Sequence, residues 1–244
     1  MPVAQTAQID GNTVGIIFMA FGVKAAASAR RSIFSLNRLG FNYPVSVVGD
    51  AKVMGTNYLE WQGESPFDVS QKNNFKFRSG RVKPFMYECS PYDWTLYVDA
   101  DVSFMKPIEE GFRALSDNDL VVTEELLSLA QLYNQQQAGW EINIQERDTT
   151  VIEIGGDDTQ KFINSGVFFF RKSDALKKLF RDWNKEWMRF QEWDEQLAFT
   201  RAIFTNPDVK IKRLPVKWNS PHLYEKDCVI YHPYGRGQIR ANPT

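Results

Sequence analysis

The segment Thr95-Leu-Tyr-Val-Asp-Ala-Asp-Val-Ser-Phe104 decides the fold, because it joins a buried β-type run to two carboxylates. Side chains alternate along an extended chain, so Asp99 and Asp101 are expected on one side, about 6 to 7 Å apart. That spacing suits ligands of a hard divalent cation such as Mg²⁺ or Mn²⁺, which leaves positions open for substrate phosphates. The alternative is a polar strand end followed by a turn, and Asp-x-Asp alone does not choose between the two.

Composition limits the class of protein. The chain has 244 residues, 43% of them hydrophobic, which is enough for one large core. The formal net charge of −1 gives no global attraction to nucleic acid or anionic membranes, so an anionic substrate must be held by local charges. Cys89 and Cys228 have neither metal-ligand nor redox spacing, which favours a reducing compartment. Without a basic leader or an apolar run of about 18 residues, the chain is expected to be cytoplasmic and to lack a membrane span.

The N-terminal region predicts a βαβ unit. Residues 14–20 form an apolar run of strand length, and residues 44–50 form a second one. Between them, apolar and small side chains recur at helical spacing over 24–39 until Gly40, a residue typical of helix ends. Strand, helix and strand in this order indicate an α/β fold with parallel strands.

The ends of these strands predict a shared binding crevice. Ligands of open α/β sheets bind beyond the carboxyl ends of the strands, where residues 20–22, Asp50 and residues 99–101 would converge. The glycines at 15 and 22 do not form a dinucleotide-binding fingerprint, and no Walker-type Gly-Lys-Ser/Thr sequence is present. Oxidoreductases of the Rossmann type and P-loop enzymes are therefore excluded.

Two polar regions flank the Asp-x-Asp segment. The basic segment 72–92, which includes Arg81 and Lys83, leads into a short helix and offers either phosphate ligands or a solvated helix face. A strand is expected over 120–123. The polar stretch 124–160 shows no core pattern, so it is either an acceptor-binding loop or a disordered excursion.

The C-terminal half contains a second apolar strand and further helices. The run 162–170 is interrupted by the polar trio Asn164-Ser-Gly166, which on its own indicates a bulged strand. Apolar spacing predicts one helix over 173–190, whose aromatic residues belong to the core, and a second helix over 193–204. At the start of the second helix Asp194 fits an N-cap and Glu195 the first turn, so structure alone explains both acids. Late strands are expected over 215–219 and 227–232, and His232 is the better ligand candidate of the two histidines.

Five ordered motifs resemble those of a known family. They are Leu96-Tyr-Val-Asp-Ala-Asp-Val102, Asn164-Ser-Gly-Val-Phe168, Glu195-Gln196, Leu214-Pro215 with Asn219, and His232 with Gly235. In this order they are similar to motifs of the GT-A fold glycosyltransferases, in particular of the retaining, metal-dependent family that includes glycogenin and the bacterial galactosyl- and glucosyltransferases. The resemblance implies a Rossmann-like mixed sheet flanked by helices in a single domain over 1–244. Residues 14–105 would then form the nucleotide-sugar half and residues 120–235 the acceptor and catalytic half.

The resemblance also implies a function and a site. A hexose would move from a nucleotide-diphosphate sugar, with UDP as the usual carrier and GDP as the alternative, to an acceptor that is a glycan, a lipid-linked sugar, a protein or a modified nucleic acid. Mn²⁺ or Mg²⁺ would be bound by Asp99, Asp101 and His232, and either Asp194 or Glu195 would lie near the anomeric carbon. The donor would contact Ala20, Phe21, Asp50, Arg81, Lys83, Asp99, Ala100, Asn164, Ser165, Gly166, Gly235 and Arg236.

The sequence departs from the family pattern at Gln238, which occupies the place of a diphosphate-binding lysine. Arg236 or Arg240 would then supply that contact. Two other functions compete with transfer. A sugar-nucleotidyltransferase needs a glycine-rich basic loop after the first strand, and residues 19–24 are a poor version of it; a non-catalytic nucleotide-sugar-binding module is favoured only by Gln238.

Overall fold

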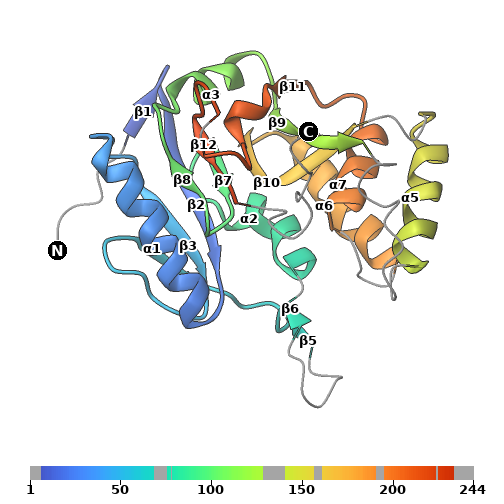
Figure 1. Cartoon of the computed structure of the whole chain (residues 1–244), viewed down its shortest axis with the longest axis horizontal. Helices are drawn as coiled ribbons and strands as arrows, with labels where there is room; N and C mark the ends of the chain where they lie inside the picture. The colour runs from blue at the N-terminus through green and yellow to red at the C-terminus, as the bar shows by residue number, and fades with distance from the viewer. Residues whose placement is uncertain are drawn as a thin grey trace, which may run out of the picture.

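The computed structural model describes residues 7–68, 76–77, 79–128, 141–156, 161–190, 195–223 and 225–233. Within these residues, eight strands form one mixed sheet in the order β11-β9-β10-β7-β2-β3-β4, with β1 beside β2 (Figure 1). The α/β class and the mixed sheet predicted from the sequence are thereby confirmed. No helix of the described part is both long and apolar enough to cross a membrane.

The centre of the sheet is parallel and its second half is mixed. β2 (Asn12–Ala20) lies between β7 (Trp94–Val98) and β3 (Val45–Gly49), and it is parallel to both. β10 (Lys161–Arg171) runs antiparallel between β7 and β9 (Leu120–Ser128), and β11 (Ile211–Leu214) is parallel to β9. The remaining described elements are β1 (Ala7–Ile9), β4 (Asn57–Glu60), β5 (Phe67–Asp68), β6 (Lys76–Phe77), β8 (Ser103–Phe104), β12 (Ile230–Tyr231), α1 (Gly22–Arg38), α2 (Met86–Cys89), α3 (Glu109–Arg113), α5 (Glu141–Glu153), α6 (Asp174–Arg189), α7 (Glu195–Phe204), and the 3₁₀ turns η1 (Ser79–Arg81), η2 (Lys83–Phe85), η3 (Ala114–Ser116) and η4 (Val216–Trp218).

Two cores cover the two faces of the sheet. Alternate residues of β2 belong to different cores: Ile16 and Phe18 pack with α1, whereas Ile17 and Met19 pack with α6 and α7. Figure 1 shows α1 on one side of the molecule and α5, α6 and α7 gathered on the other. Because both faces of β2 are buried, its sequence is a continuous apolar run rather than an alternating one.

The strongest sequence patterns give the elements that they predict. α1 ends at Arg38, and Gly40 follows with a φ of 78°, which is the left-handed conformation expected of a glycine after a helix. α6 begins after Ser173, whose hydroxyl accepts a hydrogen bond from the Leu176 N–H at 3.2 Å. The predicted bulge is also present, because the pairing of β10 with β9 shifts register between Asn164 and Phe168.

Three strand predictions need correction. β7 ends at Val98, so Asp99 and Asp101 lie in the turn after the strand and the alternation argument does not apply to them. Residues 215–219 are not a strand: β11 precedes Pro215, and η4 follows it as a 3₁₀ turn. Pro215 has no N–H to donate to a ladder, which explains why pairing stops there. The strand expected over 227–232 is reduced to β12.

A helix, α5, occupies part of the stretch that showed no core pattern. Its inner face is polar, because Glu146 and Thr150 are fully buried and both contact the buried Arg201 of α7. The Arg201 guanidinium lies 2.9 Å from Glu146 Oε1 and 2.9 Å from Glu186 Oε2, so it joins α5, α6 and α7. Since a buried ion pair replaces apolar contacts here, the hydrophobic period that identifies most helices is absent. Residues 129–140 and 157–160 of the predicted loop lie outside the described residues.

Replacing Arg201 tests the contribution of these buried ion pairs to stability. Arg201→Met leaves Glu146 buried without its cation, so we expect the free energy of unfolding to fall by about 3–5 kcal/mol in urea titrations. The control is Arg213→Met, which removes an exposed ion pair with Glu124 and is expected to change stability by less than about 1 kcal/mol. Equal stability of the two variants would contradict the structural role of Arg201.

Candidate active site

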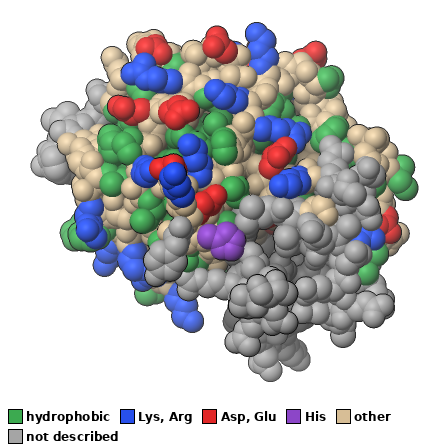
Figure 2. All heavy atoms as spheres, turned by 45° about the horizontal axis from the view of Figure 1, so that its top comes forward, with side chains coloured by type: hydrophobic (Ala, Val, Ile, Leu, Met, Phe, Trp, Pro, Cys, Tyr) green, Lys and Arg blue, Asp and Glu red, His purple; other side chains and the backbone are tan. Residues whose placement is uncertain are grey.

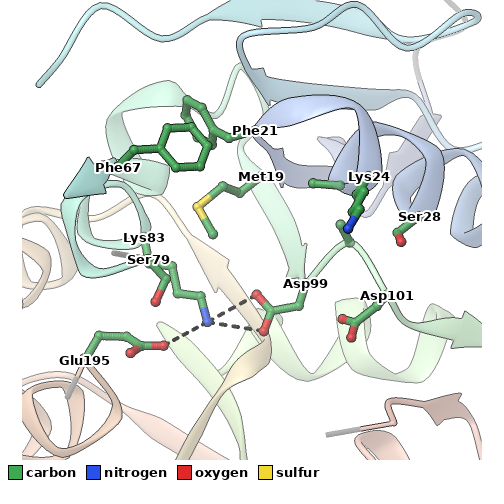
Figure 3. A pocket seen from close by; sticks show the side chains of 12 residues that line it. Met19, Phe21, Lys24, Ser28, Phe67, Ser79, Lys83, Asp99, Asp101 and Glu195 are labelled. Carbon is green, nitrogen blue, oxygen red and sulfur yellow. Dashed lines mark hydrogen bonds and ion pairs between the residues drawn. The ribbon is translucent and has the colours of Figure 1, made fainter. Parts of the chain in front are cut away.

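A pocket of about 530 Å³ lies at the carboxyl ends of β2 and β7. Figure 3 shows its side chains converging from the end of β2, the start of α1, the 3₁₀ turns, the turn after β7 and the start of α7. The lining residues are Met19, Phe21, Lys24, Ala25, Ser28, Phe67, Ser79, Lys83, Asp99, Ala100, Asp101 and Glu195. The pocket occupies the position where open α/β sheets bind their ligands, as the strand ends predicted.

Lys83 is the central charge of this pocket. Its side chain is almost completely buried, and its Nζ lies 3.1 Å from Asp99 Oδ1 and 3.1 Å from Glu195 Oε1 (Figure 3). Nζ also donates to Ser165 Oγ at 3.3 Å. Burial alone would lower the pKa of Lys83, but the two carboxylates outweigh it and raise that pKa to about 12. Lys83 therefore stays protonated at physiological pH.

Asp99 is fixed by both its backbone and its side chain. Its N–H donates to the Gly166 carbonyl at 2.8 Å, which continues the pairing of β7 with β10 past the end of the strand. The Tyr97 hydroxyl donates to Asp99 Oδ1 at 2.7 Å. Burial, followed by the nearby charge of Asp99, raises the pKa of Tyr97 well above its usual value, so the phenol remains a hydrogen-bond donor.

Glu195 is the first residue of α7 and faces Lys83. Burial alone would raise its pKa, but the Lys83 ammonium lowers that pKa below its ordinary value. The Trp183 indole donates to the Glu195 carbonyl at 2.7 Å, which ties the start of α7 to α6. Glu195 is thus an ionised carboxylate in the pocket. Asp194, the other acid considered at this position, lies outside the described residues.

Asp101 and His232 meet at the edge of the pocket. His232 Nε2 lies 3.3 Å from Asp101 Oδ1 and 3.8 Å from Asp99 Oδ2. The hydrogen bond with His232 lowers the pKa of Asp101. A Cβ added to Gly166 would stand 2.4 Å from His232 Cε1, so glycine at this position leaves room for the imidazole ring.

The orientation of His232 suits a metal ligand. Asn219 Nδ2 donates to Thr123 Oγ1 at 3.1 Å, which turns the Asn219 oxygen toward His232 Nδ1 at 2.9 Å. Nδ1 therefore carries a proton that it donates to Asn219, and Nε2, which contacts Asp101, is the nitrogen that faces the two aspartates and would bind a metal in place of that contact. Two carboxylates and one imidazole form a donor set that fits Mn²⁺ or Mg²⁺. Within the described residues, no three such side chains are already arranged around a common centre, because Asp99 is turned toward Lys83.

Several residues predicted to contact the donor lie outside the pocket wall. Asp50 accepts a hydrogen bond from the Gly22 N–H at 2.8 Å, and Arg81 donates to the Ser65 carbonyl at 3.0 Å and lines a different cavity. Ala20 is buried in the core. Phe21, Lys83, Asp99 and Ala100 do line the pocket. Gly235 and Arg236 lie outside the described residues.

The polar trio Asn164-Ser-Gly166 of β10 lies behind the residues that line the pocket. Asn164 and Ser165 are buried, and Asn164 donates to Glu125 Oε2 at 2.7 Å while its own oxygen accepts from the Gly166 N–H at 2.7 Å. The trio does not line the cavity: Ser165 contacts Lys83 and Glu195, and Gly166 lies under His232. These residues therefore position the charged side chains of the pocket and the imidazole at its edge.

Several residues of the site were not predicted from the sequence. Lys24 and Phe67 line the pocket, whereas Tyr97, Thr123 and Glu125 hold the groups around it. Lys24 follows the first strand end closely enough to have been included. The sequence around Phe67 and Glu125 carries no signal that would have placed them there.

Comparison with known proteins identifies the family. A family model described as nucleotide-diphospho-sugar transferase matches residues 95–218, just over half of the chain, including the Asp-x-Asp turn and α7. The chain belongs to this family. The glycosyltransferase family and enzyme class predicted from the sequence are thereby confirmed. A search of curated proteins by sequence finds no match.

Solved glycosyltransferases have the same fold. The galactosyltransferase LgtC, in complex with donor and acceptor sugar analogues, matches 89% of this chain and 86% of its own with 15% identity and a TM-score of 0.55. Mouse xyloside xylosyltransferase 1 in its apo form matches 90% of this chain and 97% of its own, with 15% identity and a TM-score of 0.56. At these identities the likeness shows the fold alone, and it confirms the predicted GT-A architecture.

A pair of variants tests the charge balance at Lys83. Lys83→Met leaves Asp99 and Glu195 together without their cation, so we expect a loss of about 3–5 kcal/mol in unfolding free energy at pH 7. Adding Glu195→Gln removes one of the two carboxylates and should restore part of that loss. A double variant as unstable as Lys83→Met would contradict this account.

The pH dependence of the Lys83→Met deficit has a defined sign. The raised pKa of Lys83 means that its contribution is complete below the ordinary lysine pKa of 10.5 and is lost as pH rises through about 12. The lowered pKa of Glu195 means that its contribution is present above 4.5 and is lost as pH falls through the lowered value. Urea titrations should therefore show the largest deficit near neutral pH and a smaller one at both extremes.

Proposed function

We propose that the chain is a metal-dependent hexosyltransferase that moves a hexose from a UDP-sugar to an acceptor with retention of anomeric configuration. The observation that supports this most is the buried Lys83 between Asp99 and Glu195, with Asp101 in the same pocket and His232 at its edge. A nucleoside diphosphate leaves with negative charge on its β-phosphate, and fixed positive charge in a site of this kind stabilises that departure.

The proposed metal site is built from residues of two chain segments. Asp99 and Asp101 come from the turn after β7, and His232 follows β12 and is oriented by Asn219. Mn²⁺ or Mg²⁺ bound there would act as a Lewis acid toward the diphosphate. To take part, Asp99 has to share its carboxylate between that cation and Lys83.

The protonation states of Lys83 and Glu195 are compatible with retention. Lys83 remains an ammonium and can donate to the donor sugar or to a phosphate oxygen. Glu195 is ionised, so it can stabilise positive charge at the anomeric carbon but has no proton to give to the leaving group. In the proposed retaining transfer the acceptor proton passes to the departing diphosphate, which requires acceptor and leaving group on the same face of the sugar.

The alternatives receive less support from the site. A nucleotidyltransferase needs a basic glycine-rich loop after the first strand, but here only Phe21 separates β2 from α1. The face in Figure 2 carries basic and acidic side chains interspersed, and the net charge of the chain is −1, so charge favours no one class of acceptor. Glycans, lipid-linked sugars, proteins and modified nucleic acids all remain within the proposal as acceptors.

Donor hydrolysis tests the proposed reaction. With Mn²⁺, the protein should slowly hydrolyse UDP-glucose or UDP-galactose, and Asp101→Ala should reduce the rate by about 100-fold or more because a metal ligand is lost. Asp101 is 55% exposed, so the variant is expected to fold, which circular dichroism can check. Asp117→Ala, at an exposed aspartate outside the pocket, is the control and should hydrolyse the donor like the wild type.

Two results would overturn this proposal. Turnover of a nucleoside triphosphate with a sugar phosphate would identify a nucleotidyltransferase. A protein that binds a nucleotide sugar, but neither hydrolyses it nor transfers its sugar to any acceptor tested, would be a binding module.

A further inference from the structure

The first turn of α1 brings a second lysine to the pocket. Lys24 lines the cavity together with Ala25 and Ser28, and Figure 3 shows its side chain on the same side as Asp101, away from Lys83. Unlike Lys83, it has no ion-pair partner among the residues that the structure describes. Lys24 is solvent-exposed, so a bound ligand can reach its ammonium directly.

A bound diphosphate would give the pocket an excess of negative charge that a further cation can balance. Asp99, Asp101 and Glu195 are the carboxylates among the lining residues, and Lys83 is held by two of them. The positive charges of a divalent cation and of Lys83 together equal the negative charges of these three carboxylates, which leaves none for a bound diphosphate. The diphosphate of a nucleotide sugar adds further negative charge, and among the described lining residues Lys24 is the cation left to compensate it in a partly buried site.

The helix that carries Lys24 already has a carboxylate at its N-terminus. α1 has no acidic residue in its first turn and Phe21 at its N-cap provides no side-chain hydrogen bond, but the Gly22 N–H donates to Asp50 Oδ1 at 2.8 Å. Asp50 therefore offsets the partial positive charge of this helix end, and Lys24 is the cation that remains for a ligand on this side of the pocket. Gly22, with a φ of 77°, lets the chain turn directly from β2 into the helix, so this helix end lies at the pocket rather than beyond a loop.

We propose that Lys24 binds the diphosphate of the donor from the α1 side of the pocket, while Lys83 acts from the other side. This assignment rests on the proposed function, since it requires a nucleoside diphosphate in the pocket. It makes Lys24 a determinant of affinity for the phosphates and not for the base or ribose.

Calorimetric titration of nucleotides separates these contributions. UDP, GDP, uridine and guanosine are titrated into wild-type protein and Lys24→Met at a fixed, saturating Mn²⁺ concentration. We expect Lys24→Met to weaken binding of the preferred diphosphate by about tenfold or more, the effect of losing one charged hydrogen bond, and to leave nucleoside binding unchanged. Raising the salt concentration should weaken wild-type binding more steeply than binding by the variant.

Arg30→Met is the matched control. It removes one positive charge from the same helix at an exposed position outside the pocket, and it should bind UDP and GDP as the wild type does. Unchanged diphosphate affinity in Lys24→Met would overturn the assignment, as would an equal loss for nucleoside and diphosphate, which would place Lys24 against the base or ribose. If the wild type binds neither diphosphate, the proposed function fails and the assignment fails with it.

Discussion

The candidate active site depends on one buried cation, Lys83. Removing an ammonium from water is strongly unfavourable unless its charge is compensated, and here Asp99 and Glu195 compensate it from two different parts of the chain. The turn after β7 and the start of α7 are therefore held in one place by the same charge. Ser165 of β10 contacts both Lys83 and Glu195. The polar contacts around Lys83 therefore connect β10 and the turn after β7 to the start of α7.

Further polar contacts hold the residues around Lys83 in place. Thr123 and Asn219 orient His232, while Glu125 holds Asn164 at the bulge of β10. These side chains touch one another rather than the cavity. Their effect on function is indirect: they determine which nitrogen of His232 faces the aspartates and where the Gly166 carbonyl meets Asp99.

Sequence reasoning succeeded where burial is apolar. The runs that became β2 and β10, and the helical spacing of α6, follow directly from side chains that must leave water. It failed at α5, where Glu146 and Thr150 are buried against Arg201 and no hydrophobic period exists. Asp99 and Asp101 of the Asp-x-Asp motif both line the pocket, but they lie in a turn and not in the predicted strand, because the sequence does not show that pairing ends at Val98. Lys24 and Glu125 were missed because single charged residues have no periodicity to reveal them.

The central claim is that this pocket binds a nucleotide sugar through a divalent cation. A thermal-shift screen of UDP- and GDP-sugars, each with and without Mn²⁺, tests it most directly, since a ligand that binds the native state raises its melting temperature. The account predicts that at least one UDP-hexose raises the melting temperature and that Mn²⁺ enlarges the shift. No shift with any nucleotide sugar at millimolar concentration would contradict it.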